Sequence, residues 1–253
     1  MSEKLLQKLL KEADQKKAQL DSFRPLPGEL IKELNTWFKV ELTYSSNAIE
    51  GNTFTSDETA MMIEKDLPID GKSLREHLEI VGHATAFEYV LDLSKCNRCD
   101  LTLPDILNIH KLIFDRIDEE HAGLHKNVEV TIGRPYGRYD FPIKFQDSMT
   151  QFLDWMHGVT GHPIIIAIEA HYKLIALQPF RQGNGVTARL LMNLLLLQKG
   201  YEPAIIWPED RDFYHQLLIA AEKTNNLEPL YEFITKQVIQ SFDLYLEQTK
   251  PSL

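Results

Sequence analysis

Apolar residues recur at helical spacing along most of the chain. In residues 29–50, Leu30, Leu34 and Phe38 lie four positions apart and so share one face of a helix. The same periodicity predicts helices over residues 2–20, 29–50, 55–64, 73–93, 104–117, 145–156, 163–177, 186–199, 210–223 and 229–246. Ser56 is expected to cap the third of these helices, and Gly51 and Gly200 follow two of them, as glycine commonly does at helix ends. The pattern predicts an all-α protein.

One segment departs from this periodicity. Val128, Val130 and Ile132 alternate with polar residues, which is the period of a strand that has one buried face. Residues 133–137 are rich in glycine and proline, and residues 138–141 are expected to return antiparallel to the first strand. The expected fold is therefore mainly helical with one β-hairpin.

Composition fits a globular protein that has an ordinary core. The chain has 253 residues, of which 43% are hydrophobic and 25% are charged. The formal net charge is −10, so the chain as a whole repels phosphate backbones, and nucleic acid is not an expected partner. No apolar run reaches the roughly 18 residues that a membrane span requires. No membrane association is expected.

Two further features bear on the compartment. Residues 1–17 carry charges throughout and have no apolar stretch of the kind found in signal peptides, so we expect a cytoplasmic protein. Cys96 and Cys99 form a single CxxC pair with no second pair of ligands for a structural zinc ion. We favour two thiols in a surface loop over a metal or redox site.

The turn between two strongly apolar helices contains the first candidate chemistry. Pro179 ends the helix over residues 163–177, and residues 183–185 are Gly-Asn-Gly immediately before the helix over 186–199. Free backbone N–H groups at a glycine-rich helix start attract anions. The alternative is a tight turn that needs glycine only for its shape, and the turn alone does not decide between the two.

Arg189 favours the anion site. It is expected in the first turn of the helix over 186–199, where the helix dipole disfavours a cation. An arginine in this position needs a carboxylate or a phosphate as its partner. The alternative is an arginine whose stem crosses apolar surface while its charge reaches water.

Residues 178–189 resemble the core motif of the Fic (Fido) family, HPFx(D/E)GNGRxxR. The match includes Pro179, Phe180, the Gly-Asn-Gly turn and Arg189. Residues 46–51 are similar to the inhibitory motif (S/T)xxxE(G/N) of the class II members of that family, with Ser46 and Glu50 in the defining positions. The resemblance implies a Fic domain over residues 28–253, preceded by a helical arm over residues 1–27 that packs on a partner or on a second copy.

The resemblance also implies a reaction and a set of partners. Members of the family typically transfer AMP from ATP, with Mg²⁺, to a hydroxyl of a target protein. The predicted hairpin lies where the family has its target-docking flap, which assigns Arg134, Arg138 and Tyr139 to an unknown protein target. By analogy with class II members, a homodimer is expected.

Three positions of the core motif depart from the family. Gln178 stands where the family has its general base, a histidine, and an amide cannot take up a proton at neutral pH. Gln182 stands in place of the acidic Mg²⁺ ligand, and Val186 in place of the first arginine. The backbone of Gly183, Asn184 and Gly185 remains, together with Arg189.

We therefore expect nucleotide or phosphate binding with weak or lost AMP transfer, as in a pseudoenzyme. Three alternatives stay open: a transferase with another donor or base, a hydrolase that removes AMP from proteins, and a non-catalytic interaction module. The resemblance further implies autoinhibition, in which Glu50 pairs with Arg189, although such a pair could equally serve to lock two helices together. We also expect His171 to be a buried core histidine.

Overall fold

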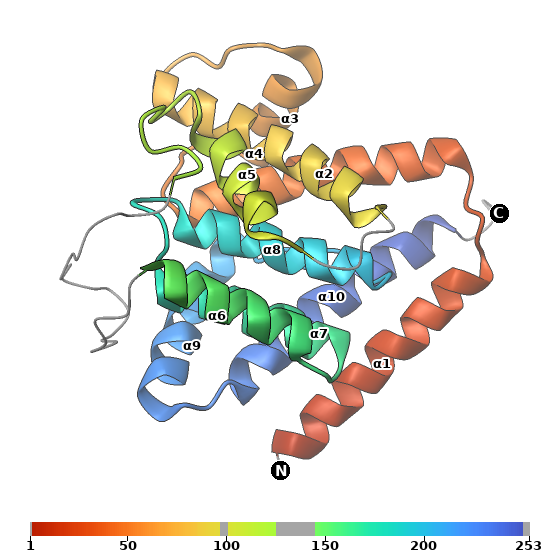
Figure 1. Ribbon diagram of the computed structural model, residues 1–253. Helices are drawn as coiled ribbons and strands as arrows, with labels where there is room; N and C mark the ends of the chain where they lie inside the picture. The colour runs from red at the N-terminus through yellow and green to blue at the C-terminus, as the bar shows by residue number, and fades with distance from the viewer. Residues whose placement is uncertain (1, 97–100, 125–144, 250–253) are drawn as a thin grey trace.

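The computed structural model describes residues 2–96, 101–124 and 145–249, and these residues form helices joined by short loops, with no strand among them (Figure 1). The helices are α1 (Ser2–Ser22), α2 (Gly28–Ile49), α3 (Ser56–Lys65), α4 (Leu74–Ser94), α5 (Leu103–Phe114), α6 (Phe145–Gly158), α7 (Pro163–Leu177), α8 (Asn184–Gln198), α9 (Arg211–Thr224) and α10 (Glu228–Gln248), with a short 3-10 helix, η1 (Pro208–Asp210), before α9. The predicted helical architecture is confirmed. The predicted hairpin over residues 128–141 lies outside the described residues.

Most helix starts lie within one residue of the prediction, and the start of α8 and the cap of α3 differ from it for a visible reason. Thr55 rather than Ser56 caps α3, because its hydroxyl accepts from the backbone N–H of Glu58 while the Glu58 carboxylate accepts from the N–H of Thr55. Helix α8 begins at Asn184 rather than at residue 186, because the left-handed Gly183 starts the helix and the N–H of Thr187 donates to its carbonyl at 3.0 Å. Arg189 therefore lies in the second turn of α8 and not in the first.

Helix α8 is the centre of the fold. It packs against α7 on one side and against α4, α5 and α2 on the other (Figure 1). Its sequence is apolar on nearly every face, and Leu190, Leu191, Met192 and Leu194 are all buried. A helix that is apolar all round is stable only when other elements surround it. This arrangement places the start of α8 where helices from both halves of the chain meet.

The N-terminal helix is covered by the same chain. Helix α1 lies along α10 (Figure 1), and its residues Leu6, Leu9, Leu10 and Leu20 belong to the main hydrophobic core, whereas Leu5 remains exposed. The apolar stripe of residues 2–20 thus packs on α10 and requires no second copy to bury it.

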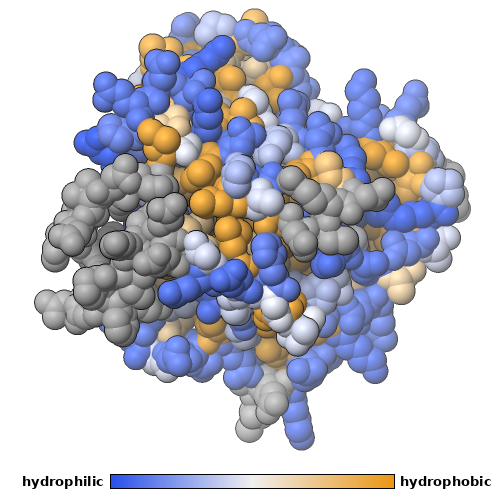
Figure 2. Space-filling view, in the orientation of Figure 1, coloured by the Kyte–Doolittle hydropathy of each residue, from blue (hydrophilic) through white to orange (hydrophobic). Residues whose placement is uncertain are grey.

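On the face drawn in Figure 2, hydrophilic residues predominate and apolar residues gather near the middle of the view. Within the described ranges, no helix is both long enough and apolar enough to cross a bilayer. Cys96 is an exposed free thiol after α4, whereas Cys99 lies outside the described residues.

A buried carboxyl group lies between α1 and α10. Only 4% of Glu202 is exposed, and its Oε1 lies 3.6 Å from Nη2 of Arg24. Burial raises the pKa of Glu202 to about 7, although Arg24 and a hydrogen bond from Tyr245 act in the opposite direction. Ionised Glu202 is therefore less favourable in the folded chain than in the unfolded chain.

Replacing Glu202 with Gln should make the stability of the protein less sensitive to pH. Because the folded pKa is raised from 4.5 to about 7, the parent loses free energy of unfolding as pH rises through this window. We expect the stability advantage of Glu202→Gln over the parent to grow by up to roughly 3 kcal/mol between about pH 4 and pH 8 in urea unfolding. Glu64→Gln, on the exposed face of α3, is the control. A difference that is the same at both pH values would contradict the assignment.

Candidate functional site at the start of helix α8

The turn between α7 and α8 is closed by its own side chains. Gln178 ends α7 in the left-handed conformation with φ of 49°, which lies outside the right-handed helical region that Pro179 disfavours for the residue before it. The backbone N–H of Phe180 donates to Asn184 Oδ1 at 2.8 Å, and Asn184 Nδ2 donates to the Phe180 carbonyl at 2.9 Å. The amide of Asn184 is therefore engaged within the turn and fixes its shape.

Sequence analysis assigned no role to His110, which packs against this turn and bonds to its backbone. Its ring stacks on Phe180 with centroids 3.8 Å apart and planes 6° apart. Because His110 Nδ1 accepts from the N–H of Gly123 at 2.9 Å, its Nε2 carries the proton and donates to the Gln182 carbonyl at 3.1 Å. Burial lowers the pKa of His110 to about 4, so the ring is neutral near pH 7. The available signal was a histidine in helical register with Ile106 and Ile113.

Gly183 is required by both its conformation and its neighbour. Its φ is +74°, which favours glycine, and a Cβ on this residue would overlap the Phe114 ring. The close approach of Phe114 leaves Gly183 as a helix start that has no side chain to cap it. Among the described residues, no capping side chain thus accepts a hydrogen bond from the first N–H groups of α8.

The predicted ion pair between Glu50 and Arg189 is present. Arg189 Nη2 donates to Glu50 Oε1 at 2.8 Å, and Arg189 also donates from Nε to Ser46 Oγ and from Nη2 to the Ser46 carbonyl, both at 2.9 Å. The side chain of Arg189 is buried, whereas 47% of the Glu50 side chain is exposed. Burial alone would lower the pKa of Arg189, but the Glu50 carboxylate and Tyr214 raise it overall. Ser46 and Glu50 thus both bind Arg189 from the C-terminal end of α2.

The Glu50 carboxylate also lies against the backbone of α8. A Cβ built on Gly185 would come within 2.5 Å of Glu50 Oε1 and 3.1 Å of Arg189 Nη1. A negative group therefore sits beside the second residue of α8, where the helix dipole and the uncapped N–H groups favour an anion. In this arrangement a carboxylate of the protein itself lies at the start of α8.

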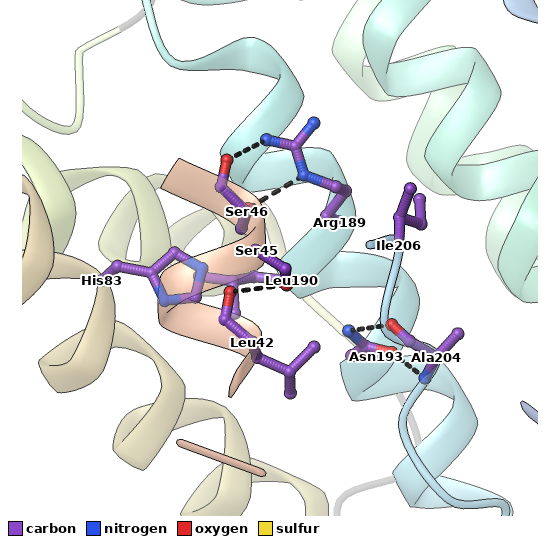
Figure 3. Close-up of a pocket in the computed structure, with 9 residues that line it drawn as sticks. All are labelled: Leu42, Ser45, Ser46, His83, Arg189, Leu190, Asn193, Ala204 and Ile206. Atoms are coloured by element: carbon purple, nitrogen blue, oxygen red, sulfur yellow. Dashed lines mark hydrogen bonds between the residues drawn. The ribbon is translucent and has the colours of Figure 1, made fainter. Parts of the chain in front are cut away.

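Two buried histidines surround Arg189. His83 Nδ1 lies 2.9 Å from Thr43 Oγ1, and His171 Nε2 lies 2.7 Å from Tyr214 Oη, so His171 is the buried core histidine that was expected. Burial, followed by the charge of Arg189, lowers the pKa of each histidine to about 3. Figure 3 shows Arg189 pointing from α8 towards Ser46 on α2, with His83 directed into the same small cavity from α4. Both rings are neutral, so the positive charge of Arg189 is balanced mainly by Glu50.

The segment that carries Glu50 is held on both sides. Arg211, at the start of α9, donates from Nε to the Ile49 carbonyl at 2.7 Å. After the helix, Asn52 Nδ2 donates to the Glu76 carbonyl and to Glu79 Oε2, at 3.2 and 3.0 Å. Contacts with α9 and α4 therefore fix the backbone around Glu50, whereas nearly half of its side chain is exposed.

The two glutamines of the motif have different environments. Gln178 Nε2 donates to the Ile175 carbonyl at 2.9 Å, so its side chain turns back towards α7. Gln182 Oε1 accepts from Arg75 Nη2 at 2.9 Å, while Gln182 Nε2 donates to Asp118 Oδ2 at 3.3 Å. No group of three or more potential metal ligands gathers anywhere in the described ranges. A metal ion does not fit at Gln182 here, because a neutral amide oxygen that already accepts from a guanidinium is a poor ligand.

The residues assigned to target docking lie outside the described part of the chain. Arg134, Arg138 and Tyr139 belong to residues 125–144, which the structure does not describe. Val186 is buried in the first turn of α8 and contributes no charge to the site.

The fold has a glycine-rich turn that leads into a central helix, and a glutamate lies against the start of that helix. Known proteins of similar sequence and fold identify the class to which this chain belongs. Residues 100–196 match the model of the Fic/DOC family. Two curated relatives, from Drosophila yakuba and Culex quinquefasciatus, carry the name Protein adenylyltransferase Fic and are 38% and 35% identical over 209 and 253 residues. These alignments cover 81% and 98% of this chain but only 41% and 49% of the relatives. The chain thus spans less than half the length of either.

Solved structures agree with this assignment. Fic-1 from C. elegans superposes with a TM-score of 0.84 at 28% identity, covering 95% of this chain and 71% of that one. A Fic domain containing signaling protein from Bacteroides thetaiotaomicron superposes with a TM-score of 0.81 at 27% identity, covering 93% of this chain and 96% of that one. The chain carries a Fic/DOC domain and belongs to this domain family.

Replacing Gly183 with Ala should destabilise the protein. The new Cβ would meet the Phe114 ring, and alanine disfavours the φ of +74°. Overpacking and backbone strain together should lower the free energy of unfolding by about 2–4 kcal/mol in urea unfolding. Gly158→Ala is the matched control, because a Cβ there would have no neighbour within 4 Å. Equal stability of the two variants would mean that Phe114 moves aside without cost.

Proposed function

We propose that this chain is a Fic-domain protein that binds a nucleoside triphosphate at the start of α8 and transfers AMP weakly or not at all. The observation that carries the proposal is the Glu50 carboxylate, which lies against Gly185 while bonded to Arg189. A site that holds a carboxylate beside an uncapped helix start and on a buried arginine has the chemistry to hold a phosphate instead. The names of the curated relatives support ATP as the nucleotide and AMP as the transferred group.

Weak transfer follows from the residues at the core motif. The amide of Gln178 cannot accept a proton from an attacking hydroxyl, and loss of a general base typically costs about 10²–10⁴ in rate. The bond from Gln178 to the Ile175 carbonyl further supports a structural use of this side chain. The acceptor in this proposal is a hydroxyl of a target protein, which would dock along residues 128–141 with Arg134, Arg138 and Tyr139. A homodimer remains part of the proposal by analogy alone.

Glu50 and Ser46 act as an inhibitory pair in this proposal. Phosphate oxygens approaching α8 would meet the Glu50 carboxylate, so the two anions compete for Arg189 and for the same backbone. Ser46 holds the arginine in place through its hydroxyl and its carbonyl whether or not Glu50 is bound. The same contacts also favour a purely structural alternative, in which the pair locks α2 onto α8.

Replacing Glu50 with Gly should increase the affinity for ATP. Without the carboxylate, Arg189 and the N–H groups of α8 become available to phosphate, and we expect Kd to fall about tenfold or more by calorimetry. Lys95→Gly is the matched control, because Lys95 ends α4 as Glu50 ends α2, with φ of −86° against −83°. An unchanged Kd, together with a loss of stability larger than that of the control, would favour the structural lock.

Restoring the motif should restore transfer. The quadruple variant Gln178→His, Gln182→Asp, Val186→Arg and Glu50→Gly supplies the base, the acidic ligand and the first arginine of the motif together, and removes the competing carboxylate. We expect labelled AMP to appear on hydroxyls of the protein itself during incubation with labelled ATP. Single reversions should do little, since groups that act on one transition state are not additive.

Two comparisons make this test selective. The triple variant that retains Glu50 should label far less than the quadruple variant, and a variant that retains Gln178 but carries the other three changes should not label. If the quadruple variant takes up no label, the site has changed beyond its motif and a non-catalytic interaction module becomes the better reading.

A further inference from the structure

Arg75 occupies a position next to the candidate nucleotide site that the core motif does not predict. It is the second residue of α4, and its Nη2 donates to Gln182 Oε1 at 2.9 Å while its Nε donates to Glu79 Oε1 at 2.9 Å. These two bonds use two of the five N–H donors of the guanidinium and leave three unassigned. The side chain is 57% exposed, so the remaining donors are accessible to a ligand.

The orientation of the Gln182 amide follows from its two partners. Its oxygen must face Arg75, which can only donate, and its nitrogen must face Asp118, whose carboxylate can only accept when ionised. Gln182 immediately precedes Gly183, the residue that starts α8. The guanidinium of Arg75 is thereby held beside the helix start by a neutral side chain.

This arrangement favours the guanidinium of Arg75 over the Mg²⁺ ion that the family resemblance implies. A divalent cation on Gln182 Oε1 would share that oxygen with a guanidinium, and the two positive charges would repel each other. Asp118 does not replace the missing acidic ligand in this conformation, because Gln182 bonds to its Oδ2 and His121 Nδ1 lies 2.7 Å from its Oδ1. Arg181 adds a further cation, with Nη1 at 3.1 Å from His121 Nε2.

We propose that Arg75 supplies the positive charge that a metal ion would otherwise bring to the nucleotide phosphates, so that this protein binds nucleoside triphosphate without a metal ion. The inference rests on the proposed function, because it concerns the same site. A guanidinium presents its donors in a planar fork that matches phosphate oxygens, and Gln182 and Glu79 fix the direction of that fork. Gln182 acts here as a positioning residue for Arg75.

The direct test is calorimetry of ATP with the full chain carrying Glu50→Gly, once in EDTA and once in excess Mg²⁺. We expect the two Kd values to agree within about threefold. Arg75→Gln in the same background should weaken binding in EDTA by about tenfold or more, and Arg75→Lys should recover part of the loss, since it keeps the charge but not the fork. Lys95→Gln, a cation removed from the opposite end of α4, is the matched control and should leave Kd unchanged.

A second variant tests the same idea by gain of metal dependence. Arg75→Gln combined with Gln182→Asp, again in the Glu50→Gly background, replaces the guanidinium with a carboxylate ligand. ATP binding by this variant should weaken in EDTA and recover in Mg²⁺ by about tenfold or more. Thermal unfolding of each variant serves as the check that it folds.

The possible failures are distinguishable. If Mg²⁺ tightens ATP binding by the Glu50→Gly chain about tenfold, and Asp118→Asn removes that gain, then Asp118 holds a metal ion and the role assigned to Arg75 is wrong. Equal binding by the Arg75→Gln variant and its Lys95→Gln control would also overturn it. If the Glu50→Gly chain binds no ATP in either condition, the proposed function itself fails.

Discussion

The positive charge of Arg189, buried near the start of α8, is the constraint on which the rest of the site depends. A buried guanidinium is stable only when a negative group and hydrogen-bond acceptors reach it. Its histidine neighbours His83 and His171 are neutral, so the compensation comes from Glu50 and Ser46 at the end of α2. Helix α2 must therefore end where it does, and its anchoring to α4 and α9 follows from the same requirement.

The site divides into a rigid part and an adaptable part. Three contacts fix the turn that starts α8: hydrogen bonds of the Asn184 side chain to Phe180, the hydrogen bond of His110 to the Gln182 carbonyl, and the packing of Gly183 on Phe114. Its backbone shape is therefore independent of what binds there. The charged side chains beside the helix start, Glu50 and Arg75, are by contrast both about half exposed. Gln178 and Gln182 can thus differ from the family motif while the backbone shape of the turn is kept.

Sequence alone predicted much of the helical fold, because helix periodicity and capping signals are local. It also predicted the ion pair of Glu50 with Arg189, since a known pattern supplied both positions. It placed Arg189 one turn too early, because the backbone conformation of Gly183 decides where α8 begins. The contact of Arg75 with Gln182 joins residues 107 positions apart, and no local pattern records such a pairing. Position along a helix is readable from sequence, whereas a polar contact between helices depends on packing.

The exposure of Glu50 has a consequence for how fast the site can respond. The backbone on both sides of Glu50 is clamped, but nearly half of its side chain faces solvent. Release of Arg189 then needs only rotation about side-chain bonds, and exposed side chains change rotamer within picoseconds to nanoseconds. Release of Arg189 would leave the helices in place, so neither a scattering profile nor the hydrodynamic radius should change when it occurs. One carboxylate, that of Glu50, would set the equilibrium between the form in which Arg189 is paired and the form in which it is released. Only ligand binding would then detect the difference between the two forms.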